Sequence, residues 1–227
     1  MLSTIIKTTV VGLLLAGAAI ASAVNLPTTP ATANPVIDVT PFNKEDELRV
    51  ITFFKFGCPI CRSYHLILEH WGRSLPSELK FQFYPIIEGN ASSAISAESL
   101  EQFLIFWSME QSGTRDQRSV FAESAYELVQ DAKAENNAQA WITAIQSSGV
   151  NYKKYKSVWD KELANPSLRL DRLIHYQPNV VPSIVICGKW MISPDSTNGN
   201  QELFMQLANG LVSKCMIEKG IKFKGKK

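Results

Sequence analysis

The sequence predicts an α/β fold in which one β-sheet is interrupted by an inserted all-helical subdomain. Two runs rich in β-branched and aromatic residues, typical of strands, lie at Arg49–Phe56 and Leu79–Ile87. From about Ala91 to Asn165 the chain shows helical spacing and no strand candidate, and strand-like runs return at 182–187 and 189–193. The expected sheet is therefore built from two distant stretches of chain.

The composition is that of one globular domain carrying an insertion. The chain has 227 residues, of which 45% are hydrophobic, enough to bury a sizeable core. Its formal charge of +2 is too small to indicate a nucleic-acid partner. Lysines gather only in residues 219–227, which we interpret as a solvated basic tail.

The first 23 residues predict a secretory signal peptide. Lys7 precedes an apolar run from Val10 to Ile20, and Ala21–Ala23 supplies the small residues that a signal peptidase reads. The alternative is a permanent membrane anchor, but the run is shorter than the roughly 20 residues that a spanning helix needs. We expect cleavage near Ala23, followed by a flexible lead-in over residues 24–44 that lacks apolar periodicity.

The main domain is expected over residues 45–90 and 166–218. After the strand Arg49–Phe56, apolar residues recur at helical spacing, and Pro59 fits the first turn because its missing N–H has no partner there. The expected inward face of this helix is Cys61, Tyr64, Leu68 and Trp71.

The insertion, residues 91–165, carries three apolar stripes at helical spacing. We interpret their aromatic residues as helix core and not as a cofactor site. The stripes are Leu100, Phe103, Leu104 and Trp107; Phe121, Ala125, Leu128 and Val129; and Ala138, Trp141, Ile142 and Ile145.

The last part of the chain predicts a short helix, a hairpin and a final helix. The short helix is expected at Leu168–His175, and Gly188 between two strand-like runs predicts a tight hairpin. In the final helix, residues spaced four apart are expected to lie on one face that points inward. These are Leu203, Leu207, Leu211 and Cys215.

The segment GCPIC, residues 57–61, places two cysteines where a strand ends and a helix begins. Unpaired N–H groups and the dipole at a helix N-terminus favour negative charge, so Cys58 is expected to be an exposed, acidic, attacking thiol. Cys61 lies on the inward face and is expected to act as the resolving sulfur. We therefore predict a redox-active Cys58–Cys61 disulfide. The alternatives are a permanent bridge or half of a zinc site.

A metal site is disfavoured because zinc needs a second pair of ligands with suitable spacing. His65 and His70 follow the motif on the same helix, and we interpret both as surface residues. We expect neither a metal nor an organic cofactor, since thiol-disulfide exchange requires none.

Cys187 and Cys215 form the second cysteine pair. If the last helix runs back along the hairpin, its end comes near the turn, and a structural disulfide becomes plausible in an oxidising compartment. Such a bridge would close a loop of about 27 residues and stabilise the fold by roughly 3 kcal/mol. The alternative is two separate buried thiols.

Two segments together resemble the DsbA family of thioredoxin-fold proteins. FFKFGCPICRSYH, residues 53–65, resembles its strand and active-site segment, and VVPSIVICGKW, residues 180–190, resembles its proline-headed strand and hairpin. The resemblance covers roughly Arg49 to the end of the last helix and implies a thioredoxin fold with a helical insertion. It also implies a cis bond between Val181 and Pro182 that faces the cysteine pair and receives an extended substrate peptide.

The same resemblance implies a monomeric periplasmic enzyme that introduces disulfides into unfolded or reduced exported proteins. A quinone-linked membrane protein would reoxidise it. The enzymatic alternative is a disulfide isomerase or reductase, although residues 24–44 are too short for the N-terminal dimerisation domain that isomerases of this fold commonly carry. The non-enzymatic alternative is a periplasmic chaperone or secretion accessory protein.

Three positions depart from the family pattern. Ile60 stands where strongly oxidising members carry a histidine, so it donates no hydrogen bond to the Cys58 sulfur. Thr52 stands where such proteins often bury an acid, and Gln82 replaces a lysine on the next strand. Because a lost buried charge changes thiol electrostatics, we hypothesise a weaker oxidant.

Overall fold

The structure, a computed structural model, describes residues 36–87, 97–165 and 167–221. The expected signal peptide, residues 1–23, lies outside the described residues, as do most of the lead-in and the end of the basic tail. Within the described ranges, no helix is both long and apolar enough to span a bilayer.

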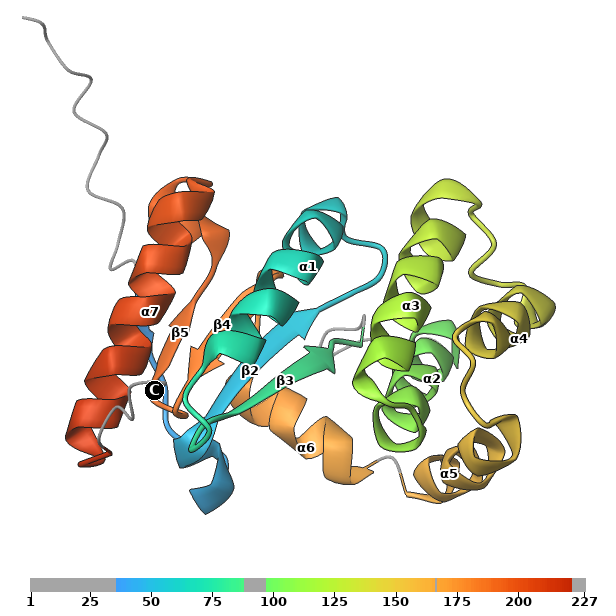
Figure 1. Ribbon diagram of the computed structural model, residues 1–227, viewed down its shortest axis with the longest axis horizontal. Coiled ribbons are helices and arrows are strands. Elements are labelled where there is room, and N and C mark those ends of the chain that lie inside the picture. The colour runs from blue at the N-terminus through green and yellow to red at the C-terminus, as the bar shows by residue number, and fades with distance from the viewer. Residues whose placement is uncertain (1–35, 88–96, 166, 222–227) are drawn as a thin grey trace, which may run out of the picture. The chain divides into compact units, whose positions relative to one another are not determined.

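In the part of the chain that the structure describes, five strands form one mixed sheet (Figure 1). They are β1 (Ile37–Asp38), β2 (Arg49–Phe54), β3 (Lys80–Pro85), β4 (Ser183–Ile186) and β5 (Trp190–Ile192), in the spatial order β1-β5-β4-β2-β3. β2 and β3 are parallel, whereas the other three pairs are antiparallel. The two distant strand groups meet at the β2–β4 pair, where Thr52 lies opposite Ile184.

The described part of the lead-in, residues 36–44, contains regular structure, whereas the sequence predicts flexibility up to residue 44. Ile37 and Asp38 pair with Met191 and Trp190 of β5 as a short edge strand. This strand escapes sequence patterning because two residues are too few to show alternation, and pairing uses only the backbone. A 3-10 turn, η1 (Lys44–Leu48), then leads directly into β2.

The β4–β5 hairpin turns at Cys187 and Gly188, which both have positive φ angles, 53° and 63°. This geometry fits the tight hairpin expected around Gly188. A Cβ added at Gly188 would lie 2.5 Å from Cβ of Pro41, so the turn has no room for a side chain there.

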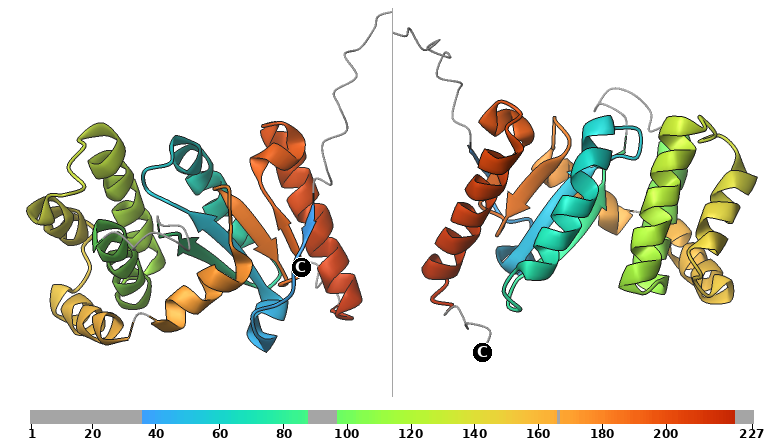
Figure 2. Two further views of the ribbon diagram at one scale, coloured as in Figure 1. Left: turned by 180° about the vertical axis from the view of Figure 1, so that it is seen from behind. Right: turned by 45° about the horizontal axis from the view of Figure 1, so that its top comes forward.

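Helices cover both faces of the sheet (Figures 1 and 2). The helices are α1 (Pro59–Ser74), α6 (Ser167–Tyr176) and α7 (Gln201–Glu218). α1 and α7 lie side by side on one face, where the rings of Tyr64 and Phe204 are 5.5 Å apart. α6 lies on the other face, where Tyr176 contacts Phe53 of β2.

The inward face of α7 differs from the expected one at its start. Leu203 is 49% exposed, while the adjacent Phe204 is fully buried together with Ala208. Leu211 and Cys215 are buried as expected. The physical reason is that a four-residue step advances about 400° on a 3.6-residue helix, so a stripe at that spacing drifts off the core-facing side.

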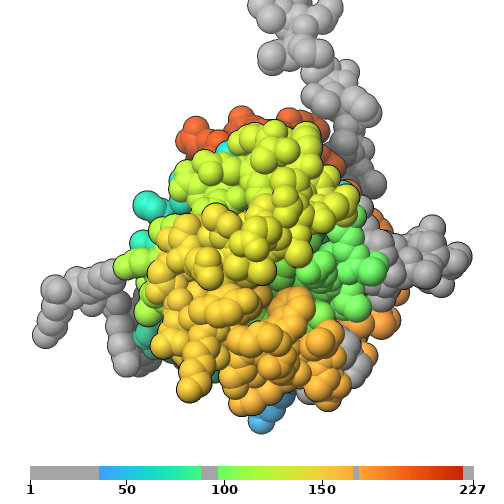
Figure 3. All heavy atoms as spheres, turned by 90° about the vertical axis from the view of Figure 1, so that its right-hand side faces the viewer, coloured from blue at the N-terminus to red at the C-terminus, as the bar shows by residue number. Residues whose placement is uncertain are grey.

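Over residues 97–165, the inserted part consists of four helices and a π-helical turn. They are α2 (Ala97–Ser112), α3 (Arg115–Tyr126), the π turn η2 (Glu127–Asp131), α4 (Ala138–Ser147) and α5 (Tyr152–Ala164). Trp107, Phe121 and Trp141, one from each expected stripe, are at most 2% exposed. Figure 3 shows the outer surface that α3, α4, α5 and α6 form on this side of the molecule.

Candidate active site

Cys58 is the N-cap residue of α1. Its backbone is extended, Pro59 takes the first turn, and the amide of Cys61 donates a hydrogen bond to Cys58 Sγ at 3.1 Å. The sulfur therefore stands where a capping oxygen usually accepts a bond from the unpaired amides of a helix N-terminus. A strand that ends at Phe54 and a proline that starts the helix create this position.

Cys58 is less exposed than the sequence predicts. Cys58 is 7% exposed and Cys61 is 2% exposed. The Val181 carbonyl oxygen lies 3.5 Å from Cys58 Sγ and accepts a hydrogen bond from the sulfur in its protonated form. Ile60, between the two cysteines, is 52% exposed, so an apolar side chain borders the approach to Cys58.

The Val181–Pro182 peptide bond is cis. Pro182 is buried, Val181 is half-buried, and Ser183 at the start of β4 donates from its hydroxyl to the Val180 carbonyl. The fold thus brings residues 181 and 182 against Cys58 across 123 positions of sequence. The Val181 carbonyl faces the sulfur, in the arrangement that the resemblance implied.

The two thiols differ in acidity. A hydrogen bond from the Cys61 side chain, followed by backbone hydrogen bonds from Cys61 and Ile60, lowers the pKa of Cys58 to about 6, against the opposing effect of burial. The hydrogen bond with Cys58 and then burial raise the pKa of Cys61. The first cysteine is therefore the thiolate of the pair, and the second keeps its proton.

Four charged or polar residues near the cysteine pair have different environments. The charge of Lys55 contributes to the lowered pKa of Cys58. Arg62 is engaged in an ion pair with Asp131, at 2.8 Å. Thr52 is fully buried with no hydrogen-bond partner for its Oγ1 among the described residues, and Gln82 accepts a bond from Arg49 at 3.0 Å.

His65 is buried, so the expectation of a surface histidine is wrong. It is 7% exposed, stacks on Phe83 at 4.3 Å, and its Nδ1 lies 3.4 Å from the hydroxyl of Tyr126. Burial lowers the pKa of His65 to about 4. The reason is its register: His65 lies one turn after Cys61 and so shares the inward face of α1. His70 is exposed, as expected.

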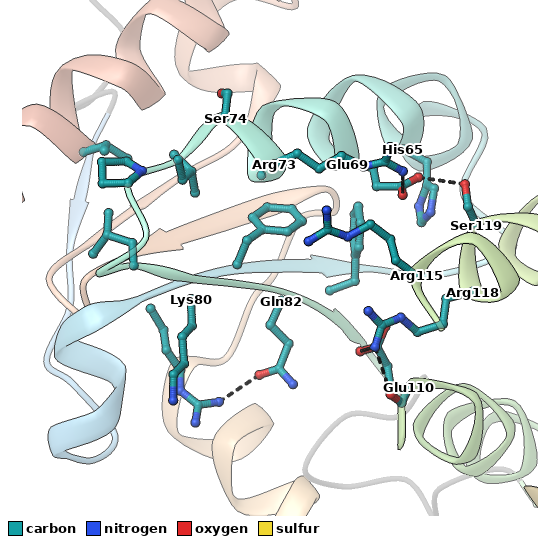
Figure 4. A pocket seen from close by; sticks show the side chains of 18 of the residues that line it. His65, Glu69, Arg73, Ser74, Lys80, Gln82, Glu110, Arg115, Arg118 and Ser119 are labelled. Atoms are coloured by element: carbon teal, nitrogen blue, oxygen red, sulfur yellow. Dashed lines mark hydrogen bonds and ion pairs between the residues drawn. The ribbon is translucent and has the colours of Figure 1, made fainter. Parts of the chain in front are cut away.

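A cavity lies away from the cysteine pair. It has a volume of about 1300 Å³ and is lined by α1, β3, α2 and α3 (Figure 4). Its labelled side chains are mostly charged: Glu69 accepts a hydrogen bond from Ser119 at 2.9 Å, and Arg118 pairs with Glu110 at 3.3 Å. None of its lining residues is a cysteine, so the cavity is separate from the redox site.

Gln130, on η2, contacts the active-site loop and was not predicted from the sequence. Its Nε2 donates to the carbonyl oxygens of Phe56, at 2.7 Å, and Cys58, at 3.1 Å. More than 70 residues separate the partners. A lone glutamine on a helix carries no spacing signal, so only the fold reveals this contact.

Cys187 and Cys215 form a disulfide with a Cα–Cα distance of 6.4 Å. It joins the turn of the β4–β5 hairpin to the last turns of α7. The pairing corresponds to the bridge expected from the sequence. Cys58 and Cys61 are both free thiols in this structure. Within the described ranges no three His, Cys, Asp or Glu side chains are arranged to hold a metal ion.

Comparisons with known sequences point to one group of proteins. No protein-family model matches the chain. The thiol:disulfide interchange protein DsbA of Burkholderia cepacia is 25% identical over 156 residues, which cover 67% of this chain and 68% of that protein. DsbA of Pseudomonas aeruginosa is 22% identical over 177 residues, 77% of this chain and 79% of its own.

Solved structures give the same result for the fold. The crystal structure of Pseudomonas aeruginosa DsbA has a TM-score of 0.67 at 18% identity and covers 82% of this chain and 95% of its own. NmDsbA1 from Neisseria meningitidis has a TM-score of 0.60 at 15% identity, with 86% and 91% covered. The expected fold class, a thioredoxin fold with a helical insertion, is confirmed.

Proposed function

The chain is DsbA-like, a protein thiol:disulfide oxidoreductase, and from this premise we propose that it introduces disulfides into exported proteins through Cys58 and Cys61. The observation that carries the proposal is the hydrogen bond from the Cys61 amide to Cys58 Sγ, in a site that lowers the pKa of Cys58 to about 6. A stabilised thiolate is a good leaving group, so the Cys58–Cys61 disulfide is readily reduced and hence oxidising.

The exchange begins with the oxidised pair. A substrate thiolate attacks Cys58 Sγ, the Cys58–Cys61 bond breaks, and the electron pair goes to the Cys61 sulfur, which takes up a proton. The raised pKa of Cys61 favours this protonated product. A second substrate thiolate then attacks the substrate sulfur of the mixed disulfide, and Cys58 leaves as a thiolate. The substrate loses two electrons and gains one disulfide.

Val181 and Pro182 form the proposed substrate-binding edge. The cis bond presents the Val181 backbone beside the sulfur, where an extended peptide can add as a strand. A DsbA variant from Proteus mirabilis, with 16% identity and a TM-score of 0.64, is described as a complex with the peptide PWATCDS. Pro59 and Ile60 complete the proposed active-site motif.

The proposed surroundings of the reaction are supported by the predicted signal peptide and the family resemblance. We place the chain in the periplasm as a monomer after cleavage near Ala23, acting on unfolded or reduced exported proteins. A quinone-linked membrane protein would accept the two electrons and restore the disulfide. The pair needs neither metal nor organic cofactor, because sulfur carries both electrons.

The test is the oxidation of a reduced, unfolded protein that regains activity when its disulfides form. We expect the wild-type chain to restore activity and Cys58→Ser to lose this ability completely, because no mixed disulfide forms. When Cys61→Ser is mixed instead with a disulfide-bonded substrate, the Cys58 thiolate should attack that disulfide and release one substrate thiolate. The mixed disulfide at Cys58 should then accumulate, because no Cys61 sulfur is present to resolve it. A Cys58→Ser variant that works as well as the wild type would favour the chaperone or accessory role.

A second pair of assays separates oxidase from reductase and isomerase. Insulin reduction by the reduced chain and reshuffling of a scrambled disulfide protein are measured beside the oxidation assay. An oxidase should catalyse the oxidation assay faster than it catalyses insulin reduction or the reshuffling of disulfides. Faster insulin reduction or reshuffling would overturn the proposed direction of electron flow.

A further inference from the structure

The side-chain amide of Gln130 ties two carbonyl groups of the active-site loop to the helical insertion. Its Nε2 donates to Phe56 O at 2.7 Å and to Cys58 O at 3.1 Å. These carbonyls flank Gly57, an exposed residue without a side chain to anchor it. The loop between β2 and α1 is thus held on one side by Gln130.

Gln130 lies on the π turn η2, and both ends of this turn also contact α1. Tyr126, just before the turn, lies with its hydroxyl 3.4 Å from Nδ1 of His65. Asp131, the last residue of the turn, pairs with Arg62 at 2.8 Å. π turns are rare and occur frequently at functional sites. Tyr126, Gln130 and Asp131 thus make contacts with the loop and the first two turns of α1.

The Cys58 carbonyl is the atom through which this contact reaches the sulfur. It accepts a second hydrogen bond, from the Arg62 amide at 3.2 Å, which is the first bond of α1. The Cys58 amide in turn donates to Lys55 O at 3.2 Å. The backbone on both sides of the Cys58 Cα is therefore hydrogen-bonded, which limits how far the sulfur can move from the Cys61 amide.

We propose that Gln130 is a positioning residue for thiol-disulfide exchange, which holds Cys58 so that its sulfur stays within hydrogen-bond reach of the Cys61 amide. The inference rests on the proposed function of the cysteine pair. Without the Gln130 amide, two carbonyl dipoles near the thiolate lose a donor, and the loop gains freedom. Both changes disfavour the charged form of the sulfur.

The alternative role for Gln130 is purely structural. In that case its loss would lower the stability of the fold, equally in the oxidised and reduced forms, and leave the acidity of Cys58 unchanged. A positioning role moves the acidity of Cys58 itself. The two roles therefore differ in a quantity that is independent of overall stability.

The test compares Gln130→Met and Gln130→Ala, which both lack the donor, with the wild-type chain. The control is Gln117→Met, on α3, which removes another hydrogen bond from a glutamine Nε2 to a backbone carbonyl, that of Gly149 at 2.6 Å. The thiolate absorbance of the reduced chains is followed against pH, and their redox equilibrium is measured against glutathione.

We expect both Gln130 variants to raise the pKa of Cys58 and to lower the equilibrium constant for oxidation of glutathione by about three- to tenfold, in the range of one lost hydrogen bond. Gln117→Met should leave both values unchanged. Unaltered values in folded Gln130 variants, or an equal shift in the control, would overturn the proposal.

A measurement on the wild-type chain makes the test independent of variant folding. The NMR signals of the Gln130 side-chain amide should shift with the same midpoint pH as the Cys58 thiolate, and a flat signal would contradict the contact. The acidity readout also separates the two proposals. If the chain proved inactive as an oxidant while Gln130 still controlled the pKa of Cys58, only the proposed function would fail.

Discussion

The guanidinium group of Arg172 forms two hydrogen bonds with the carboxylate of Asp46, at 2.9 and 3.0 Å, inside the protein. Asp46 is fully buried and Arg172 is 7% exposed. The hydroxyl of Tyr176 donates a third bond to the carboxylate, at 2.9 Å. This cluster joins η1, before β2, to α6, the helix that precedes the Val181–Pro182 bond.

Removing one member of this buried pair should destabilise the fold strongly. Asp46→Asn leaves the Arg172 charge without its partner, and we expect a loss of about 3 kcal/mol in the free energy of unfolding. Urea denaturation measures it. The control, Lys156→Met, breaks the exposed Lys156–Asp160 pair and should cost less than about 1 kcal/mol. Equal losses in the two variants would contradict the buried geometry.

His65 should make the fold sensitive to acid. Its pKa is about 4 in the folded chain and about 6.5 when unfolded, so between these values the unfolded chain binds the extra proton. The His65 contribution to stability is fully present above pH 6.5 and is lost, by up to roughly 3 kcal/mol, as the pH falls towards 4.

Denaturation of His65→Phe across this pH range checks the assignment. Phenylalanine keeps an aromatic ring against Phe83 without a titrating group, so the pH dependence of stability should flatten. His70→Phe is the matched control because His70 is exposed on the same helix. An unchanged slope in His65→Phe would show that another group titrates.

The reduced pair should react through one sulfur with an acidic midpoint. Alkylation by iodoacetamide should label Cys58, with a rate that rises with pH around a midpoint of about 6, because the thiolate is the nucleophile. Cys61 should stay unlabelled in the folded chain. Peptide mass mapping gives the labelled residue, and a midpoint near that of a free cysteine, about 8.5, would contradict the stabilised thiolate.

The Cys187–Cys215 disulfide should contribute to stability and not to exchange. Replacing both cysteines with alanine should lower the free energy of unfolding by roughly 3 kcal/mol, since the 28-residue separation makes the closed loop substantial. Oxidation of substrate at permissive temperature should persist. A double variant that keeps full stability, or that loses the exchange reaction while folded, would argue against this division of roles.

Ile60 should limit the oxidising power of the site. Ile60→His introduces a polar ring between the two cysteines, from a position that is 52% exposed, and its N–H can reach the Cys58 thiolate. We expect a lower pKa of Cys58 and a more oxidising disulfide. Ile60→Leu, which adds no donor, should leave both unchanged. Equilibration with glutathione measures the difference.

Local patterns in the sequence predicted much of this molecule. GCPIC between a strand and a helix was enough to place Cys58 at the helix start, since the motif needs only neighbouring residues. The burial of His65 was also readable, because it lies four residues after Cys61 on the inward face. The four-residue spacing in the last helix predicts a buried Leu203 and is wrong there, because four residues are more than one full turn.

Contacts between distant segments were not predictable in the same way. Gln130 reaches Phe56 and Cys58 only because η2 folds back against α1, and the Asp46–Arg172 pair spans 126 residues. Each of these side chains is an ordinary polar residue in its own segment. Their partners are decided by packing, which a single sequence without internal periodicity does not encode visibly.

Strand β4 starts beside Pro182 and ends just before Cys187, so it separates the redox-active cysteine pair from the Cys187–Cys215 disulfide. A strand of this length spans about 13 Å, far more than the 2 Å of a sulfur–sulfur bond. The reactive thiolate is therefore insulated from the chain's own bridge. Scrambling between the two pairs would require the sheet to open, which lets a catalyst of disulfide exchange keep its own disulfide intact.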